Sequence, residues 1–186
     1  MILLSLALAE EPEVGPGPPG VPPEAGIKAF EEQIWPVFVH PRCANCHPAG
    51  DVPLQGDEQR PHTMEVDRDS PAVGLPCSTC HRTEGLDLPD RPPANGHWSF
   101  PPANQVFEGR TAAELCNQLK DPETTGGRDL EALRHHVEHD TLVLYGWDPG
   151  PERTSPAVSH VDFVAAFQVW LDAGAPCPTD DAQGSM

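Results

Sequence analysis

The chain has 186 residues, of which 29 are Asp or Glu and 11 are Lys or Arg, so its formal charge is −18. A chain this acidic repels nucleic-acid phosphates and anionic lipid, and no segment is apolar over the roughly 20 residues that a membrane helix needs, so we expect neither nucleic-acid binding nor membrane insertion. Only 38% of the residues are hydrophobic, and 24 prolines and 16 glycines interrupt the chain. Side chains alone are therefore poorly suited to filling a conventional core.

Two segments precede the expected domain. Residues 2–9 form an apolar and small run ending in Ala7-Leu8-Ala9, which is typical of a signal-peptide cleavage site, although no basic residue precedes it. We expect residues 1–9 to be a signal peptide and the protein to be periplasmic; an uncleaved hydrophobic tail is the alternative. Residues 10–26 are rich in Pro, Gly and Glu and are expected to form a disordered leader.

The first expected helix leads into a cysteine motif. Apolar residues recur at helical spacing over residues 27–38, and Pro36 should kink the last turn. The residues of this stripe are Ile27, Phe30, Ile34 and Phe38.

The chain carries the pattern C-x-x-C-H twice, as Cys43-Ala44-Asn45-Cys46-His47 and Cys77-Ser78-Thr79-Cys80-His81. This is the attachment pattern of c-type haem. Two thiols one helical turn apart can each add to one haem vinyl group, and the histidine that follows then lies under the iron. We therefore predict two haem c groups, with thioether bonds from the four cysteines and with His47 and His81 as proximal iron ligands.

Two other interpretations of the cysteines remain. Two CxxC pairs can form a four-cysteine zinc ribbon, but such pairs are typically about 15–20 residues apart. Here 30 residues separate Cys46 from Cys77, and zinc gives no reason for a histidine after both pairs. A thioredoxin-like redox CxxC would need a strand before it and a helix after it, and neither is evident.

Three later helices complete the expected domain. Thr111 and Glu114 form a capping box that opens a helix over 112–120, and a second helix follows over roughly 129–140. The third begins after Ser159, has an apolar stripe and stops near Gly174. The stripe consists of Val164, Phe167, Trp170 and Leu171.

These elements predict a mostly α fold, with class I cytochrome c-like helices and little or no β structure. Long loops rich in Pro and Gly, over residues 48–76 and 82–110, should wrap the two haems. The dihaem domain is expected to span residues 27–178 and to be followed by a flexible tail over 179–186.

Cys116 and Cys177 remain once four cysteines are assigned to haem. In an oxidising compartment a leftover pair usually forms a disulfide, so we predict this bridge, with two buried thiols as the alternative.

The distal iron ligands must come largely from histidine, because Met64 is the only methionine away from the two ends of the chain. His62 lies in the loop between the two motifs. On the 129–140 helix, His136 falls about 90° from the apolar stripe, whereas His135 and His139 point away from it. We therefore name His62 and His136 as distal candidates.

A longer set of residues resembles a family of small bacterial dihaem cytochromes, often labelled as cytochrome subunits of isoquinoline 1-oxidoreductase-type enzymes. The similarity covers about residues 28–178. It includes the segments His40-Pro41-Arg42-Cys43-Ala44-Asn45-Cys46-His47, Pro61-His62, Cys77-Ser78-Thr79-Cys80-His81, Phe107-Glu108-Gly109, Ala113-Glu114-Leu115-Cys116, Gly146-Trp147 and Ala175-Pro176-Cys177-Pro178. The resemblance implies electron transfer, places both remaining cysteines in the family pattern, and matches His62 and His136 to positions where the family has histidine.

The chain departs from this family at one loop. Relatives often have Trp-His-Leu-Pro-Pro followed by Met, whereas this chain has Trp98-Ser99-Phe100-Pro101-Pro102 and Gln105. If that loop supplies an axial ligand in relatives, His97 is the reserve candidate here.

Two functions are compatible with these observations. The first is a periplasmic dihaem cytochrome c that carries single electrons, mainly with bis-His ligation and without catalytic residues, and that docks on a basic patch of a redox protein. The family label associates such cytochromes with a molybdenum-hydroxylase-type oxidoreductase as partner. The alternative is a dihaem enzyme or sensor in which one five-coordinate haem binds peroxide or a diatomic gas.

Overall fold

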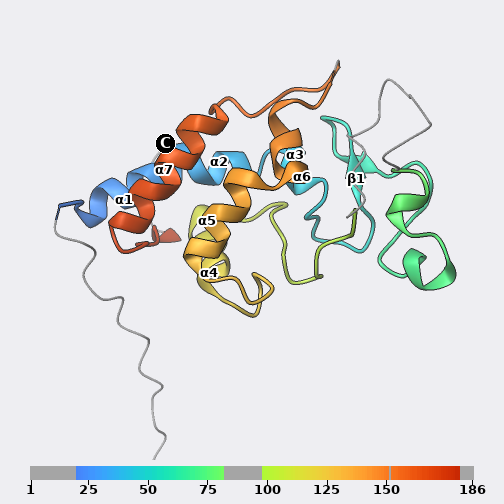
Figure 1. Ribbon diagram of the computed structural model, residues 1–186, viewed down its shortest axis with the longest axis horizontal. Helices are drawn as coiled ribbons and strands as arrows, with labels where there is room; N and C mark the ends of the chain where they lie inside the picture. Colours follow the sequence, from blue (N-terminus) through green and yellow to red (C-terminus); the bar gives the residue numbers. More distant parts are fainter. Residues whose placement is uncertain (1–19, 82–97, 151, 181–186) are drawn as a thin grey trace, which may run out of the picture.

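The computed structural model describes residues 20–81, 98–150 and 152–180. Over these residues the chain is mostly helical, as predicted (Figure 1). The helical elements are α1 (Pro23–Ala29), the π-helical turn η1 (Phe30–Ile34), α2 (Trp35–Phe38), α3 (Pro41–Ala44), the 3-10 turns η2 (Ser70–Val73) and η3 (Cys77–Thr79), α4 (Ala112–Lys120), α5 (Leu130–His139), α6 (Thr141–Leu144), the 3-10 turn η4 (Tyr145–Trp147) and α7 (His160–Asp172). Two short antiparallel strands, β1 (Leu54–Gln55) and β2 (Arg60–Pro61), pair Leu54 with Pro61. None of the helices in the described ranges is long and apolar enough to span a membrane.

The helix before the first motif ends at Phe38 as predicted but begins earlier than predicted. It begins at Pro23 with Glu24 in its first turn, because proline is tolerated at the first helical position and an acidic side chain favours a helix start. The last residues of the predicted leader are therefore helical. Near Pro36, which lacks an N–H and crowds the preceding turn, the backbone widens into η1, where the Trp35 N–H donates to the carbonyl of Phe30. The π-helical turn thus lies directly before the turn that contains Pro36, in which the kink was predicted.

Helix α7 packs along α1 and supplies the centre of the core (Figure 1). Trp170 is fully buried, with its ring 5.2 Å from those of Phe30 and Phe167. Its indole N–H donates to the carbonyl of Pro176 at 2.9 Å. Gly26 allows the two helices to approach, because a Cβ atom at this position would lie 2.5 Å from the Cβ of Ala173.

The observed bounds of α4 and α5 confirm the predicted ones. The Thr111 hydroxyl accepts a hydrogen bond from the N–H of Glu114, whose carboxylate accepts in return from the N–H of Thr111, and α4 begins at the next residue. Asp129 caps α5 through its carboxylate, which accepts a hydrogen bond from the N–H of Ala132. A disulfide between Cys116 and Cys177 joins α4 to the segment that follows α7, as predicted.

The second motif lies in a lobe at the far end of the molecule from α1 and α7 (Figure 1). In the range 49–81, all of which the structure describes, Ser70 is the only buried residue. Large apolar side chains of this lobe are instead exposed, namely those of Val52, Met64, Val73 and Leu75. Protein side chains from this range therefore do not supply a core for the lobe.

Candidate functional site

Both cysteine motifs adopt the same local backbone. In the first motif the N–H of His47 donates to the carbonyl of Cys43, and in the second the N–H of His81 donates to that of Cys77. Each motif is therefore one helical turn, and the first turn continues α3. This geometry places the two thiols of each motif one turn apart, with the histidine directly after them, as covalent attachment of haem requires.

The ring of His47 is held on two sides. Its Nδ1 lies 3.0 Å from the carbonyl oxygen of Gln105, and its ring stacks on Phe107 with centroids 3.9 Å apart and planes 16° from parallel. A carbonyl can only accept a hydrogen bond, so Nδ1 carries the proton and Nε2 keeps its lone pair. This is the tautomer that a metal-bound histidine adopts.

The pKa of His47 is lowered to about 4, chiefly by burial, while the hydrogen bond to Gln105 opposes the shift. Positive charge on His136 and Arg68 lowers this pKa further. His47 is therefore neutral at physiological pH, as iron coordination requires.

His136 lies on the half-buried side of α5, and a carboxylate lies beside its Nδ1 atom. Its Nδ1 is 3.5 Å from Asp140 Oδ2, and the other carboxylate oxygen of Asp140 accepts from the N–H of Leu142 at 2.8 Å. Burial lowers the pKa of His136, and Asp140 opposes that shift. Because Asp140 is fixed as the cap of α6, it can orient the His136 ring with Nε2 directed away from the carboxylate.

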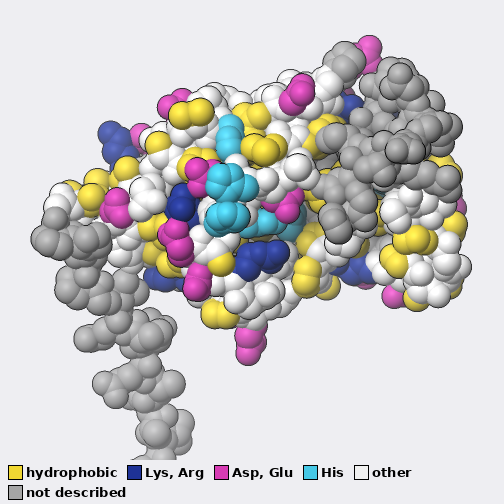
Figure 2. Space-filling model, in the orientation of Figure 1, with side chains coloured by type: hydrophobic (Ala, Val, Ile, Leu, Met, Phe, Trp, Pro, Cys, Tyr) yellow, Lys and Arg dark blue, Asp and Glu magenta, His cyan; other side chains and the backbone are white. Residues whose placement is uncertain are grey.

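The other histidines of α5 follow the predicted orientation. Figure 2 shows histidine side chains gathered at the centre of one face, over α5. His135 and His139 are exposed there, with ring centroids 4.5 Å apart. His136, one position along, is the half-buried member of the group.

The second motif places His81 between two aromatic side chains. The His81 ring stacks on Trp98 with centroids 4.7 Å apart, and the ring of His62 lies 6.3 Å from it with the two planes 70° apart. Two imidazoles bound to opposite sides of one metal ion, with metal–nitrogen bonds of about 2 Å, would have centroids about 6 Å apart. The observed separation therefore fits a pair of axial ligands.

His62 makes a hydrogen bond through Nδ1, not through the Nε2 atom that would bind iron. The N–H of Met64 donates to His62 Nδ1 at 3.2 Å, which puts the ring proton on Nε2. Coordination through Nε2 would therefore require this long hydrogen bond to be released. Met64 itself is 64% exposed.

One ten-residue segment touches both motif histidines. It begins at Trp98 against His81 and ends at Gln105 and Phe107 against His47. The two motifs are also linked electrostatically, since the charge of Cys77 helps to raise the pKa of Cys46. The sequence carried no signal for the roles of Trp98 and Gln105, because these contacts depend on how the loop returns to the helices.

The cysteines of the first motif lack the lowered pKa of a redox-active pair. Burial, with smaller contributions from neighbouring thiols, raises the pKa of Cys43 to about 12 and that of Cys46 to about 11, although Arg42 opposes both shifts. A redox-active CxxC pair instead needs a lowered thiol pKa. Over the described residues, no three His, Cys, Asp or Glu side chains gather as a metal site, so the zinc interpretation gains no support.

Two other histidines form hydrogen bonds with backbone groups. His40 Nδ1 accepts from the N–H of Arg42, and His160 Nε2 lies 3.0 Å from the carbonyl oxygen of Val137. Both therefore have structural partners. His97, the reserve distal candidate, lies outside the described residues.

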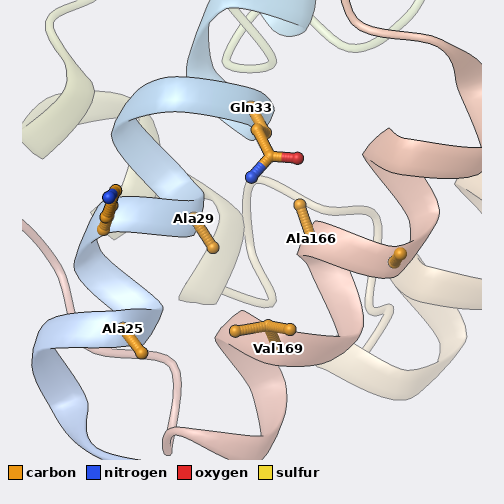
Figure 3. Close-up of a pocket in the computed structure, with 7 residues that line it drawn as sticks. Ala25, Ala29, Gln33, Ala166 and Val169 are labelled. Carbon is orange, nitrogen blue, oxygen red and sulfur yellow. The ribbon is translucent and has the colours of Figure 1, made fainter.

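A pocket detected in the structure is remote from these sites. It has a volume of about 270 Å³ and lies between α1 and α7, where Ala25 and Ala29 face Ala166 and Val169 (Figure 3). This volume is below the usual range for small-molecule sites, and its lining includes no Cys or His.

Comparison with known proteins adds no relative: no family model, no curated protein and no solved structure matches this chain. The resemblance drawn from the motifs therefore stays an expectation, and the function has to be inferred from the residues themselves.

Proposed function

We propose that the protein is a dihaem c-type cytochrome that carries single electrons between redox partners outside the cytoplasm. The observation that carries this proposal is the pair His62 and His81, whose ring separation of 6.3 Å suits the two sides of one iron. His81 belongs to a C-x-x-C-H turn, and His62 was named from the sequence as a distal candidate. Within residues 49–81 only Ser70 is buried, and this shortage of buried side chains supports a large apolar cofactor beside the second motif.

The first site supports the same function. His47 would be the proximal ligand, because its Nδ1 proton is held by Gln105 and Nε2 is available. His136 would be the distal ligand, with Asp140 behind it. Cys43 and Cys46 would hold this haem by thioethers, and Cys77 and Cys80 the other.

A bis-histidine haem supplies reversible one-electron chemistry at iron. The chain's own contribution is to fix ligand orientation and to keep both motif histidines in contact with one segment. Donor and acceptor are expected to be proteins with basic patches, because the formal charge of −18 attracts such surfaces and steers encounter. Association should therefore weaken as ionic strength rises.

The test is to express the chain with periplasmic haem maturation and to count covalently bound haem. We expect two haems per chain, one after Cys43→Ala/Cys46→Ala, and one after Cys77→Ala/Cys80→Ala. The matched control is Cys116→Ala/Cys177→Ala, which removes two cysteines that form the disulfide and should keep both haems. Absence of covalent haem from the wild-type chain would overturn the proposal.

Binding of carbon monoxide to the reduced protein distinguishes the electron-carrier function from the enzyme or sensor function. A reduced protein with two bis-histidine haems should show no spectral change on addition of CO. A complete shift of one haem would instead favour the five-coordinate alternative.

A further inference from the structure

The guanidinium of Arg68 is held inside the protein by three different groups. Nε lies 3.1 Å from Asp51 Oδ1, Nη1 donates to the carbonyl of Pro101, and the Cζ atom is 4.1 Å from the centre of the Phe100 ring. The Arg68 side chain is 17% exposed, whereas that of Asp51 is 78% exposed. The acidic partner is therefore largely in water and compensates the buried charge only weakly.

The third nitrogen of this guanidinium is buried without a partner among the described residues. Nη2 of Arg68 is inaccessible to solvent and makes no hydrogen bond to any of them, although arginine has five N–H donors. Leaving a buried charged donor unpaired costs more free energy than leaving a neutral donor unpaired. Such an atom calls for an acceptor that belongs to the working protein.

Arg42, a second buried arginine, also has one buried N–H without a partner among the described residues, at Nε, but its charge is compensated more strongly. Its Nη2 is 2.6 Å from Asp57 Oδ1, and the other oxygen of Asp57 accepts from the N–H of Thr154. Only 30% of the Asp57 side chain is exposed. The charge of Arg42 is thus already met by a held carboxylate, whereas that of Arg68 is not.

Arg68 stands beside the first haem site. Its own N–H donates to the carbonyl of Asp51, four residues after His47. Its Nη1 holds Pro101, four residues before Gln105, whose carbonyl bonds the His47 ring. The guanidinium therefore joins the two segments that flank His47.

We propose that Nη2 of Arg68 donates to a propionate carboxylate of the haem bound by Cys43, Cys46 and His47. This inference rests on the proposed dihaem function and adds to it a residue that binds the cofactor periphery. A propionate is an ionised carboxylate, and arginine N–H groups form their strongest hydrogen bonds with such acceptors. The pair would compensate the charge of both groups inside the protein.

The pair of Arg68 and the propionate should also affect the reduction potential of the first haem. Reduction adds one negative charge to the haem, so a positive charge nearby favours the reduced state. Removal of Arg68 would leave the propionate uncompensated and would disfavour reduction. Arg68 is thus expected to raise the reduction potential of the first haem.

The experiment is a spectroelectrochemical titration of the dihaem protein and its Arg68→Gln variant. We expect reduction of one haem to become about tenfold less favourable, a fall of about 59 mV for one electron, while the other haem changes less. Arg68→Lys keeps the charge and should recover more than half of this shift. Arg60→Gln is the control, because Arg60 and its partner Glu58 are each 70% exposed.

The possible outcomes test the role of Arg68 separately from the proposed cytochrome function. If Arg68→Gln and Arg60→Gln give the same potentials in a protein that carries two haems, Arg68 does not pair with a propionate, although the cytochrome function stands. An equal fall in Arg68→Lys and Arg68→Gln would show that charge is not the cause and would also overturn it. A wild-type potential that depends on added phosphate at constant ionic strength would assign Nη2 to a free anion instead.

Discussion

Loss of the disulfide between Cys116 and Cys177 should lower stability by an amount that the chain length sets. The two cysteines are 61 positions apart, and the bridge closes a loop that contains α5, α6 and α7. In the chain-entropy account, a loop of this length stabilises the folded state by about 4 kcal/mol. For a domain of this size each kcal/mol corresponds to roughly 2–4 °C, so the melting temperature should fall by about 10 °C.

The assay is thermal unfolding, followed by far-UV circular dichroism, of the wild-type protein and of Cys116→Ala/Cys177→Ala. The single variant Cys177→Ala is the matched control, since it opens the same loop and should melt near the double variant. Alkylation of the denatured wild-type chain should label neither cysteine, which shows that the bridge is present in the measured sample. A double variant that melts within about 2 °C of a bridged wild type, less than 1 kcal/mol on this scale, would refute the loop-closure reasoning.

Three further predictions concern the histidines. His62→Ala and His136→Ala should each open one haem, so that one equivalent of CO binds per reduced chain, whereas the exposed control His135→Ala should bind none; equal spectra for all three would contradict the distal assignment. Asp140→Ala should weaken His136 ligation and make part of one haem reactive with CO, because the carboxylate that orients the ring is removed; CO titration of the reduced variant checks this. In the haem-free chain the pKa of the buried His47 is about 4 against an ordinary 6.5, so between these pH values the unfolded chain binds a proton that the folded chain does not. The stability of the haem-free chain should therefore fall by about 3 kcal/mol as the pH drops from 7 to 4, and urea unfolding of that chain at fixed pH values that shows no such loss would contradict the burial of a neutral His47 ring.

The helices with clear caps could be predicted from the sequence closely. The Thr111–Glu114 box and the apolar spacing after Asp129 are local signals, and the structure begins both helices where these signals lie. The start at Pro23 was missed because the composition of the leader extends through the first turn of the helix. The strands β1 and β2, at two residues each, are too short for an alternating pattern to be recognised.

The candidate sites divide in the same way. The thiols and proximal histidines are adjacent in the sequence, so their spacing is enough to identify them. The orientation of His136 followed from helical geometry, whereas the position of His62 beside His81 depends on the path of a loop with little regular structure. Arg68 carried no signal at all, because its significance lies in an N–H group left unused by the described residues, which only three-dimensional packing reveals.

The segment that begins at Trp98 and ends at Phe107 imposes a constraint on how this chain can change over evolution. Its two ends pack against different histidines. The number of residues in the segment must therefore match the distance between the His81 site and the His47 site. Deleting or inserting one residue between Trp98 and Gln105 would force one histidine to lose its partner. Substitutions can therefore accumulate within this segment, but its length is fixed by both centres at once.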